Sequence, residues 1–125
     1  MNDIVKALKQ RLLIHKPLAS NVFSGSLALG PDFPGFQGHF PGNPILPGVC
    51  LIEAAVQLIS SGAKRNLFLA ELERVKFFSP VKPGDKVELD FHVEYLADGV
   101  AAKGTIMSGQ RKICTIKMKL AGEKS

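Results

Sequence analysis

The sequence has no tryptophan, one tyrosine and only two cysteines among its 125 residues. Cys50 and Cys114 both stand in apolar segments, which favours two buried thiols over a disulfide framework. Also missing is an apolar run of the roughly 20 residues that a membrane-spanning helix requires. Residues 1–15 interleave charged and apolar side chains, whereas a signal peptide has an uninterrupted apolar core. We therefore expect a cytoplasmic protein with no membrane segment.

Blocks of like charge and internal repeats are absent as well. The net charge is +5, but the 16 lysines and arginines are scattered along the chain, and no aromatic residues are interleaved with them as on a base-stacking surface. These absences argue against nucleic acid as a partner, while the positive balance suits an acidic protein. At 46% hydrophobic residues, we expect residues 1–125 to form a single domain with one core.

Hydrophobic periodicity predicts a short amphipathic helix over residues 3–13 and a second helix over 48–62. Alternation of apolar and polar residues predicts strands over residues 21–29, 69–78, 86–96, 100–107 and 112–120. The helix over 48–62 has no polar stripe, so we expect protein on nearly all of its sides. The last four strands are expected to form an antiparallel meander with one solvated face. The pattern therefore predicts an α+β fold, with the sheet curled around the apolar helix.

A loop rich in glycine and proline, residues 31–48, carries His39 and leads directly into the apolar helix. Such a loop is stiff, so it fixes where His39 points. The first N–H groups of the helix, including that of Gly48, lack intrahelical acceptors and suit a developing oxyanion. Glu53 is the one carboxylate in the helix, and its cost of desolvation favours the protonated form, which suits a proton donor. A base, an oxyanion donor and an acid are thus candidates for one site.

Each of these residues has a simpler interpretation. His39 alone is compatible with a structural loop histidine, and Glu53 with a buried ion pair to a lysine or arginine. Because His39 has no second histidine, cysteine or carboxylate at ligand spacing, we expect no metal. Cys50 has no adjacent base, which disfavours a thiol nucleophile, although a position near a helix N-terminus would lower its pKa.

Four segments of the sequence carry a family resemblance. They are GHFP at 38–41, PILPGV at 44–49, EAAVQ at 53–57 and VKFFSPVKPGD at 75–85. Together they closely resemble the (3R)-hydroxyacyl-acyl carrier protein dehydratases of the FabZ type. The resemblance implies the hotdog fold, in which a curved antiparallel sheet wraps a long central helix, and this agrees with the pattern of helices and strands.

The resemblance also implies a reaction. His39 would remove the α-proton of a 3-hydroxyacyl thioester, and Glu53 would help protonate the departing hydroxyl group. The Gly48 N–H would polarise the thioester carbonyl, and Gln57 would support the site. The products would be water and a trans-2-enoyl thioester, with the substrate carried on the phosphopantetheine of acyl carrier protein and no cofactor of the enzyme itself.

In this family the histidine and the acid of one site come from different subunits, which implies a homodimer or a trimer of dimers. Phe40, Pro47 and Val49 are the further residues expected to support the site. Contacts to the acidic carrier are expected among five basic residues, namely Lys64, Arg65, Arg74, Lys76 and Lys82.

Two alternatives to a dehydratase of fatty-acid or related lipid or secondary-metabolite biosynthesis remain open on this fold. One is a hotdog acyl-thioesterase in which Glu53 activates water. The other is a non-catalytic acyl-binding or dimerisation module. Since a fold is a weak guide to function, the paired residues His39 and Glu53 carry the preference for the dehydratase.

Overall fold

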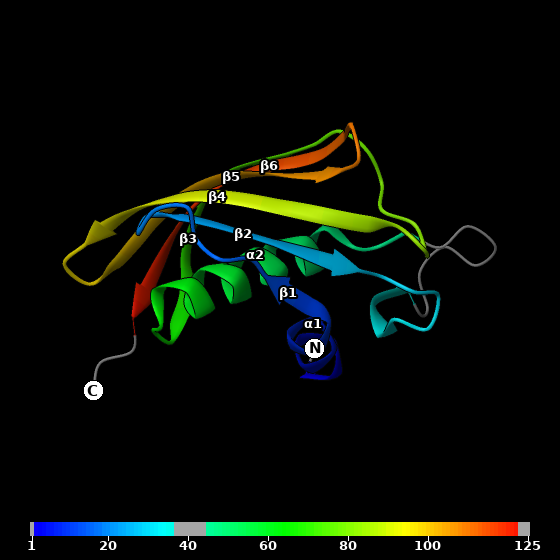
Figure 1. Ribbon diagram of the computed structural model, residues 1–125, viewed down its shortest axis with the longest axis horizontal. Helices are drawn as coiled ribbons and strands as arrows, with labels where there is room; N and C mark the ends of the chain where they lie inside the picture. Colours follow the sequence, from blue (N-terminus) through cyan, green and yellow to red (C-terminus); the bar gives the residue numbers. More distant parts are fainter. Residues whose placement is uncertain (1, 37–44, 123–125) are drawn as a thin grey trace.

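The computed structural model describes residues 2–36 and 45–122 (Figure 1). His39 and Phe40 lie outside the described residues. The helices are α1 (Asn2–Arg11), the 3-10 turn η1 (Pro34–Phe36) and α2 (Gly48–Ala63). The strands are β1 (Leu12–Ile14), β2 (Val22–Ala28), β3 (Leu67–Phe77), β4 (Lys86–Leu96), β5 (Gly99–Ser108) and β6 (Arg111–Gly122). Within these ranges, no helix has both the length and the apolar character to cross a membrane.

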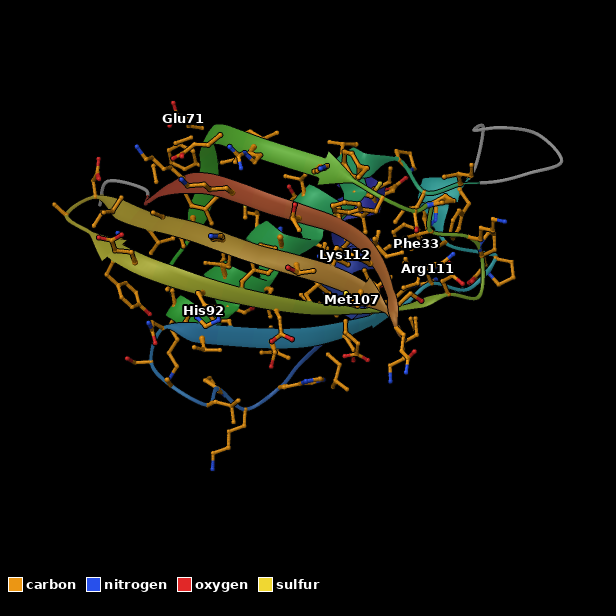
Figure 2. All side chains as sticks on the ribbon, turned by 90° about the horizontal axis from the view of Figure 1, so that it is seen from above. Phe33, Glu71, His92, Met107, Arg111 and Lys112 are labelled. Atoms are coloured by element: carbon orange, nitrogen blue, oxygen red, sulfur yellow. The ribbon has the colours of Figure 1, made fainter. Side chains whose placement is uncertain are left out.

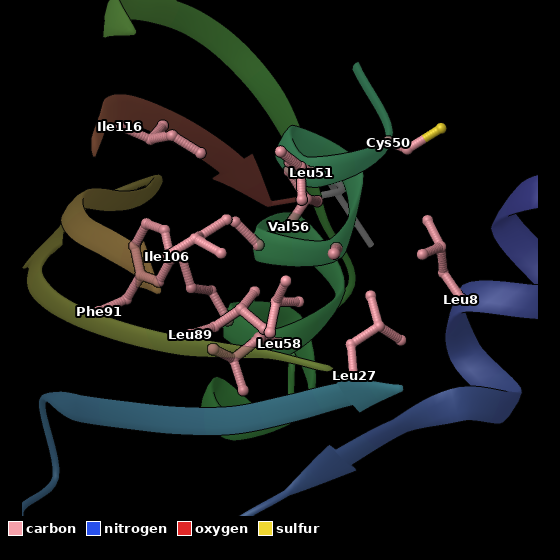
Figure 3. Packing of buried hydrophobic residues seen from close by; sticks show 14 of the residues in the cluster. Leu8, Leu27, Cys50, Leu51, Val56, Leu58, Leu89, Phe91, Ile106 and Ile116 are labelled. Atoms are coloured by element: carbon pink, nitrogen blue, oxygen red, sulfur yellow. The ribbon is translucent and has the colours of Figure 1, made fainter. Parts of the chain in front are cut away.

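The six strands form one antiparallel sheet in the order β1-β2-β4-β5-β6-β3, which curves over α2 (Figure 1). Inward-facing residues of the sheet pack against Cys50, Leu51, Val56 and Leu58 of α2 (Figure 3). The predicted alternation is confirmed on β6, where every second residue from Cys114 to Leu120 is buried. A curved sheet around a central helix is therefore the observed architecture, as the sequence predicted.

The strand order corrects one prediction. Strands β4, β5 and β6 form a meander, but β3 does not join it beside β4. Instead β3 pairs with β6 at the edge of the sheet, from Leu67 opposite Gly122 to Phe77 opposite Cys114. The segment 78–85 then crosses back to β4. Two of its residues, Pro80 and Pro83, have no N–H to donate to a ladder, so a tight hairpin between β3 and β4 is disfavoured.

The first helix is also shorter than predicted. It ends at Arg11, and Leu12–Ile14 pairs with β2, with Ile14 opposite Gly25. A Cβ atom on Gly25 would lie 2.8 Å from the Leu13 carbonyl oxygen, so the missing side chain permits this close approach. The hydrogen bonds offered by the edge of β2 outweigh the local helical pattern.

Helix α2 is not surrounded on all sides by its own chain. Its inner side is buried through residues such as Cys50, Ala55 and Leu58, but Val49 is 54% exposed and Glu53 and Gln57 are partly exposed. The apolar character of the helix predicted burial on nearly all of its sides. Sequence periodicity does not tell whether this chain or another molecule covers each side. Val49, Glu53 and Gln57 thus form a partly exposed stripe of α2, and Gln57 shares a surface pocket with Lys9 of α1 and with Leu12 and Ile14 of β1.

The end of α2 lies slightly beyond the prediction. Gly62 does not break the helix. The Phe23 ring occupies the space where a side chain at position 62 would stand. Lys64 closes the helix instead, in the left-handed conformation with φ of 55°, and its N–H donates to the carbonyl oxygens of Ser60 and Ser61. This conformation usually falls to glycine or asparagine.

Candidate active site at the start of helix α2

Among the described residues, no side chain caps the hydrogen-bond donors at the N-terminus of α2. Pro47 is extended, with φ of −60° and ψ of 142°, and its side chain makes no capping hydrogen bond. The Cys50 N–H donates to the Pro47 carbonyl oxygen at 3.0 Å, so the N–H groups of Gly48 and Val49 precede the first bonded one. These groups carry the positive partial charge of a helix N-terminus. The start of α2 therefore presents N–H donors of the expected kind, and the role of Gly48 as an oxyanion donor stays a prediction.

A mostly apolar groove of about 350 Å³ lies beside Gly48. Its walls come from the start of α2 and from the end of β3 with the following loop. They consist of Ile45, Leu46, Gly48, Leu51, Phe77, Phe78, Ser79, Pro80 and Val81. A groove of this character suits an acyl chain and an extended pantetheine arm.

Phe77 explains why glycine stands at position 48. A Cβ atom on Gly48 would lie 2.5 Å from Cζ of the Phe77 ring, so any side chain there would displace the ring. Segment 75–85 carries part of the family resemblance, but Phe77 and Phe78 were not predicted to belong to the site. The sequence did contain a signal for this contact. It was a glycine at the first position of a helix together with an aromatic pair at the end of a strand.

Glu53 and Gln57 lie one turn apart on the partly exposed side of α2. The Gln57 Nε2 donates a hydrogen bond of 2.7 Å to Glu53 Oε1, so the predicted supporting role of Gln57 has a physical basis. The alternative of a buried ion pair is not observed. No cation of the described residues lies within ion-pair distance of Glu53.

The chain does not bring Glu53 to the groove beside Gly48. Five residues separate the two, which is about 140° around a helix of 3.6 residues per turn, and Glu53 is not among the residues that line the groove. Among the other expected supporting residues, Pro47 is partly buried at the start of the helix and Val49 is exposed beside it. Within one chain, Gly48 therefore lines the groove and Glu53 does not.

The cysteines are poor candidates for chemistry. Burial raises the pKa of the Cys50 thiol, and the Glu53 carboxylate adds to the rise. The expectation that the helix N-terminus would lower this pKa is wrong, because the side chain faces the core (Figure 3). Burial likewise raises the pKa of Cys114 to about 11. Within the described ranges, no cluster of three or more histidine, cysteine or acidic side chains is placed to hold a metal ion.

Comparison with known proteins identifies the family. The model of the ApeI-like family, described as ApeI dehydratase, matches residues 16–115. This chain belongs to the ApeI-like dehydratase family. One curated relative is the 3-hydroxyacyl-[acyl-carrier-protein] dehydratase FabZ of Geobacter metallireducens. It is 42% identical to this chain over 107 residues, and the alignment covers 72% of this chain and 70% of the relative. The resemblance to FabZ-type dehydratases is thereby confirmed.

A second relative and a solved structure agree with this assignment. FabZ of Alkaliphilus metalliredigens is 36% identical over 96 residues, covering 70% of the ApeI-like chain but only 65% of the relative's length. The dehydratase heterocomplex ApeI:P from Xenorhabdus doucetiae superimposes with a TM-score of 0.74 over 89% of this chain and 98% of that one, at 24% identity. That likeness confirms the hotdog fold predicted from the sequence.

Proposed function

We propose that this ApeI-like protein dehydrates a (3R)-hydroxyacyl thioester, carried on the phosphopantetheine of acyl carrier protein, to the trans-2-enoyl thioester. The observation that carries the proposal is the uncapped start of α2 at Gly48, which lies in an apolar groove of a dehydratase-family chain. An α-proton is weakly acidic unless enolate charge is stabilised as it forms. The Gly48 N–H supplies that stabilisation at the thioester carbonyl.

Two side chains transfer protons in the proposed reaction. His39, in the loop before α2 but outside the described residues, accepts the α-proton. Glu53, held by Gln57, donates a proton to the departing hydroxyl group, which leaves as water. The electron pair of the broken C–H bond becomes the new carbon–carbon double bond. No electron leaves the substrate, so the reaction requires no redox cofactor.

Around these groups, three residues are given supporting roles. Pro47 fixes the start of the helix and so the direction of the Gly48 N–H. Val49 presents an apolar surface beside it. Phe40 follows His39 directly in the sequence and is assigned to the wall of the site.

We assign each site to two subunits of a homodimer, or of a trimer of dimers. The absence of Glu53 from the lining of the Gly48 groove supports this arrangement, as does the exposure of Val49 on the same stripe of the helix. Strand β3 supplies a further argument. It is an 11-residue edge strand on which large apolar side chains are exposed, including Phe68, Leu69 and Leu72. An edge of this kind readily pairs with the same strand of a second copy.

The proposed carrier is acidic, which suits the net charge of +5. Its contacts are assigned to the basic residues Lys64, Arg65, Arg74, Lys76 and Lys82. The proposed setting is the cytoplasm, because the two thiols are free and buried. The proposed pathway is fatty-acid synthesis or a related lipid or secondary-metabolite synthesis.

The test uses the purified protein and a (3R)-hydroxyacyl-acyl carrier protein, with loss of water followed by mass spectrometry. We expect enoyl product from the wild type and a rate about 10²- to 10⁴-fold lower from His39→Ala. His92→Ala is the matched control, because His92 is exposed on the outer face of the sheet (Figure 2). The dehydratase is excluded if no enoyl product forms and His39→Ala behaves as the wild type does.

The two alternatives give different results in the same assay. A thioesterase releases free thiol from the acyl carrier and depends on Glu53 but not on His39. A binding module retains the carrier but turns over no thioester, and the removal of either side chain leaves its affinity unchanged.

A further inference from the structure

An aromatic ring at the rim of the Gly48 groove is shared by two lysines. The Nζ atoms of Lys76, on β3, and Lys112, on β6, each lie 5.4 Å from the centroid of the Phe78 ring. Phe78 lines the groove and is 47% exposed. Its N–H donates to the Ile113 carbonyl oxygen at 2.8 Å, which ties the residue to β6. Cation–π attraction thus holds two ammonium groups beside the mouth of the groove.

The two lysines have no acidic partner among the described residues. Nearby basic side chains, in contrast, have acidic partners. Arg111, which lies at the same end of the sheet as Lys112 (Figure 2), binds Asp85 Oδ2 at 2.9 Å. Lys86 Nζ lies 3.8 Å from Glu88 Oε1. Two unneutralised cations beside one ring repel each other, and an anion placed between them removes that repulsion.

We propose that Lys76 and Lys112, held by Phe78, bind the phosphate group of the phosphopantetheine arm. This rests on the proposed function, which places the thioester end of the arm at Gly48. Phe78 and Gly48 line one groove, and Phe78 is the lining residue that contacts the two lysines, so the proposal assigns the phosphate end of the arm to the Phe78 end of the groove. Lysine binds phosphate as a point charge, and its long side chain follows a flexible ligand. The apolar groove walls then contact the uncharged part of the arm.

The experiment compares the binding of 4′-phosphopantetheine with that of pantetheine, which lacks the phosphate. Both are titrated into the assembled protein and followed by calorimetry. We expect the wild type to bind 4′-phosphopantetheine at least tenfold more tightly, which corresponds to about 1.4 kcal/mol. In Lys76→Gln/Lys112→Gln the two ligands should bind equally. In Phe78→Leu, which keeps both lysines but removes the ring, the preference should fall.

The matched control is Lys6→Gln/Lys103→Gln, which removes two exposed lysines on α1 and β5 and should keep the preference. Equal binding of both ligands by the wild type overturns the proposal, as does an equal loss of preference in the two double variants. Inorganic phosphate is titrated as a competitor, and it should weaken the binding of 4′-phosphopantetheine but not that of pantetheine. Phosphate that binds the wild type and Lys76→Gln/Lys112→Gln equally would overturn the proposal. A wild type that prefers 4′-phosphopantetheine but yields no enoyl product overturns the proposed function alone.

Discussion

The Gln57 side chain fixes the Glu53 carboxyl group through a hydrogen bond of 2.7 Å from Nε2 to Oε1, one helical turn apart. Both side chains lie on the partly exposed stripe of α2. A proton donor contributes to a transition state only while it is correctly oriented. The Gln57 amide therefore has a positioning role in the proposed reaction, because it contacts the acid and not the substrate.

Replacement of Gln57 by methionine tests that role. Methionine has a similar size but cannot donate the hydrogen bond, and a neutral hydrogen bond contributes about 0.5–1.5 kcal/mol. We expect kcat to fall roughly 3- to 10-fold, while KM and the melting temperature stay near the wild-type values. Steady-state kinetics and thermal denaturation measure these quantities. Ser61→Ala, an exposed change on the same helix, is the control. A parallel fall in the melting temperature would show that the hydrogen bond stabilises the fold instead.

Mixed subunits test whether one site takes its histidine and its acid from different chains. His39→Ala and Glu53→Gln subunits are each expected to be inactive alone. Half of the dimers formed on random mixing contain one subunit of each kind. In each mixed dimer, a shared arrangement restores one of the two sites, so activity should return to about a quarter of the wild-type level. Activity that stays at the level of the single variants would place both residues of a site in one chain.

The sequence alone predicted the helices and strands that are specified by residues close together in the chain. Helix α2 and strand β4 occupy nearly the predicted ranges, because apolar residues recur at the spacing of a helix in one and alternate in the other. The i, i+4 spacing also places Glu53 and Gln57 on one side of α2. These properties depend on neighbours in the chain, which a sequence displays directly.

The features that escaped prediction depend on residues far apart in the chain. The edge position of β3 follows from its pairing with β6, about 45 residues later, and local alternation does not specify a partner strand. Gly62 continues its helix because Phe23 packs on it, and Gly48 is free of a side chain because Phe77 lies over it. In both cases an aromatic ring from a strand far away in the sequence takes the space of the missing side chain.

The exposed edge of the sheet gives a prediction about assembly. Leu72 lies on β3 and is 43% exposed, and a lysine at this position would place a charge in a strand-to-strand interface. We expect Leu72→Lys to shift the protein from dimer to monomer and to abolish dehydration, since the sites are assigned to paired subunits. Sedimentation velocity measures the first effect. Leu18→Lys is the control, because Leu18 is 92% exposed outside the strands. A Leu72→Lys protein that remains dimeric would move the interface away from this edge.

The buried thiol of Cys114 gives a prediction about stability at alkaline pH. Burial raises its pKa from an ordinary value of 9.0 to about 11 in the folded protein. Above pH 9 the unfolded chain therefore loses this proton while the folded protein retains it. The free energy of unfolding falls as pH rises through this range, and the stability is fully present only below pH 9.

Denaturation at several pH values between 8 and 11 measures this effect. We expect the thiol to remove about 2 kcal/mol of stability by the upper end of the range, and Cys114→Ala to show a correspondingly shallower dependence on pH. Val87→Ala is the matched control, because it truncates another fully buried side chain that does not titrate. That variant should be less stable at every pH yet keep the wild-type slope. Equal slopes in the wild type and Cys114→Ala would mean that the thiol ionises as readily in the folded protein as in the unfolded chain.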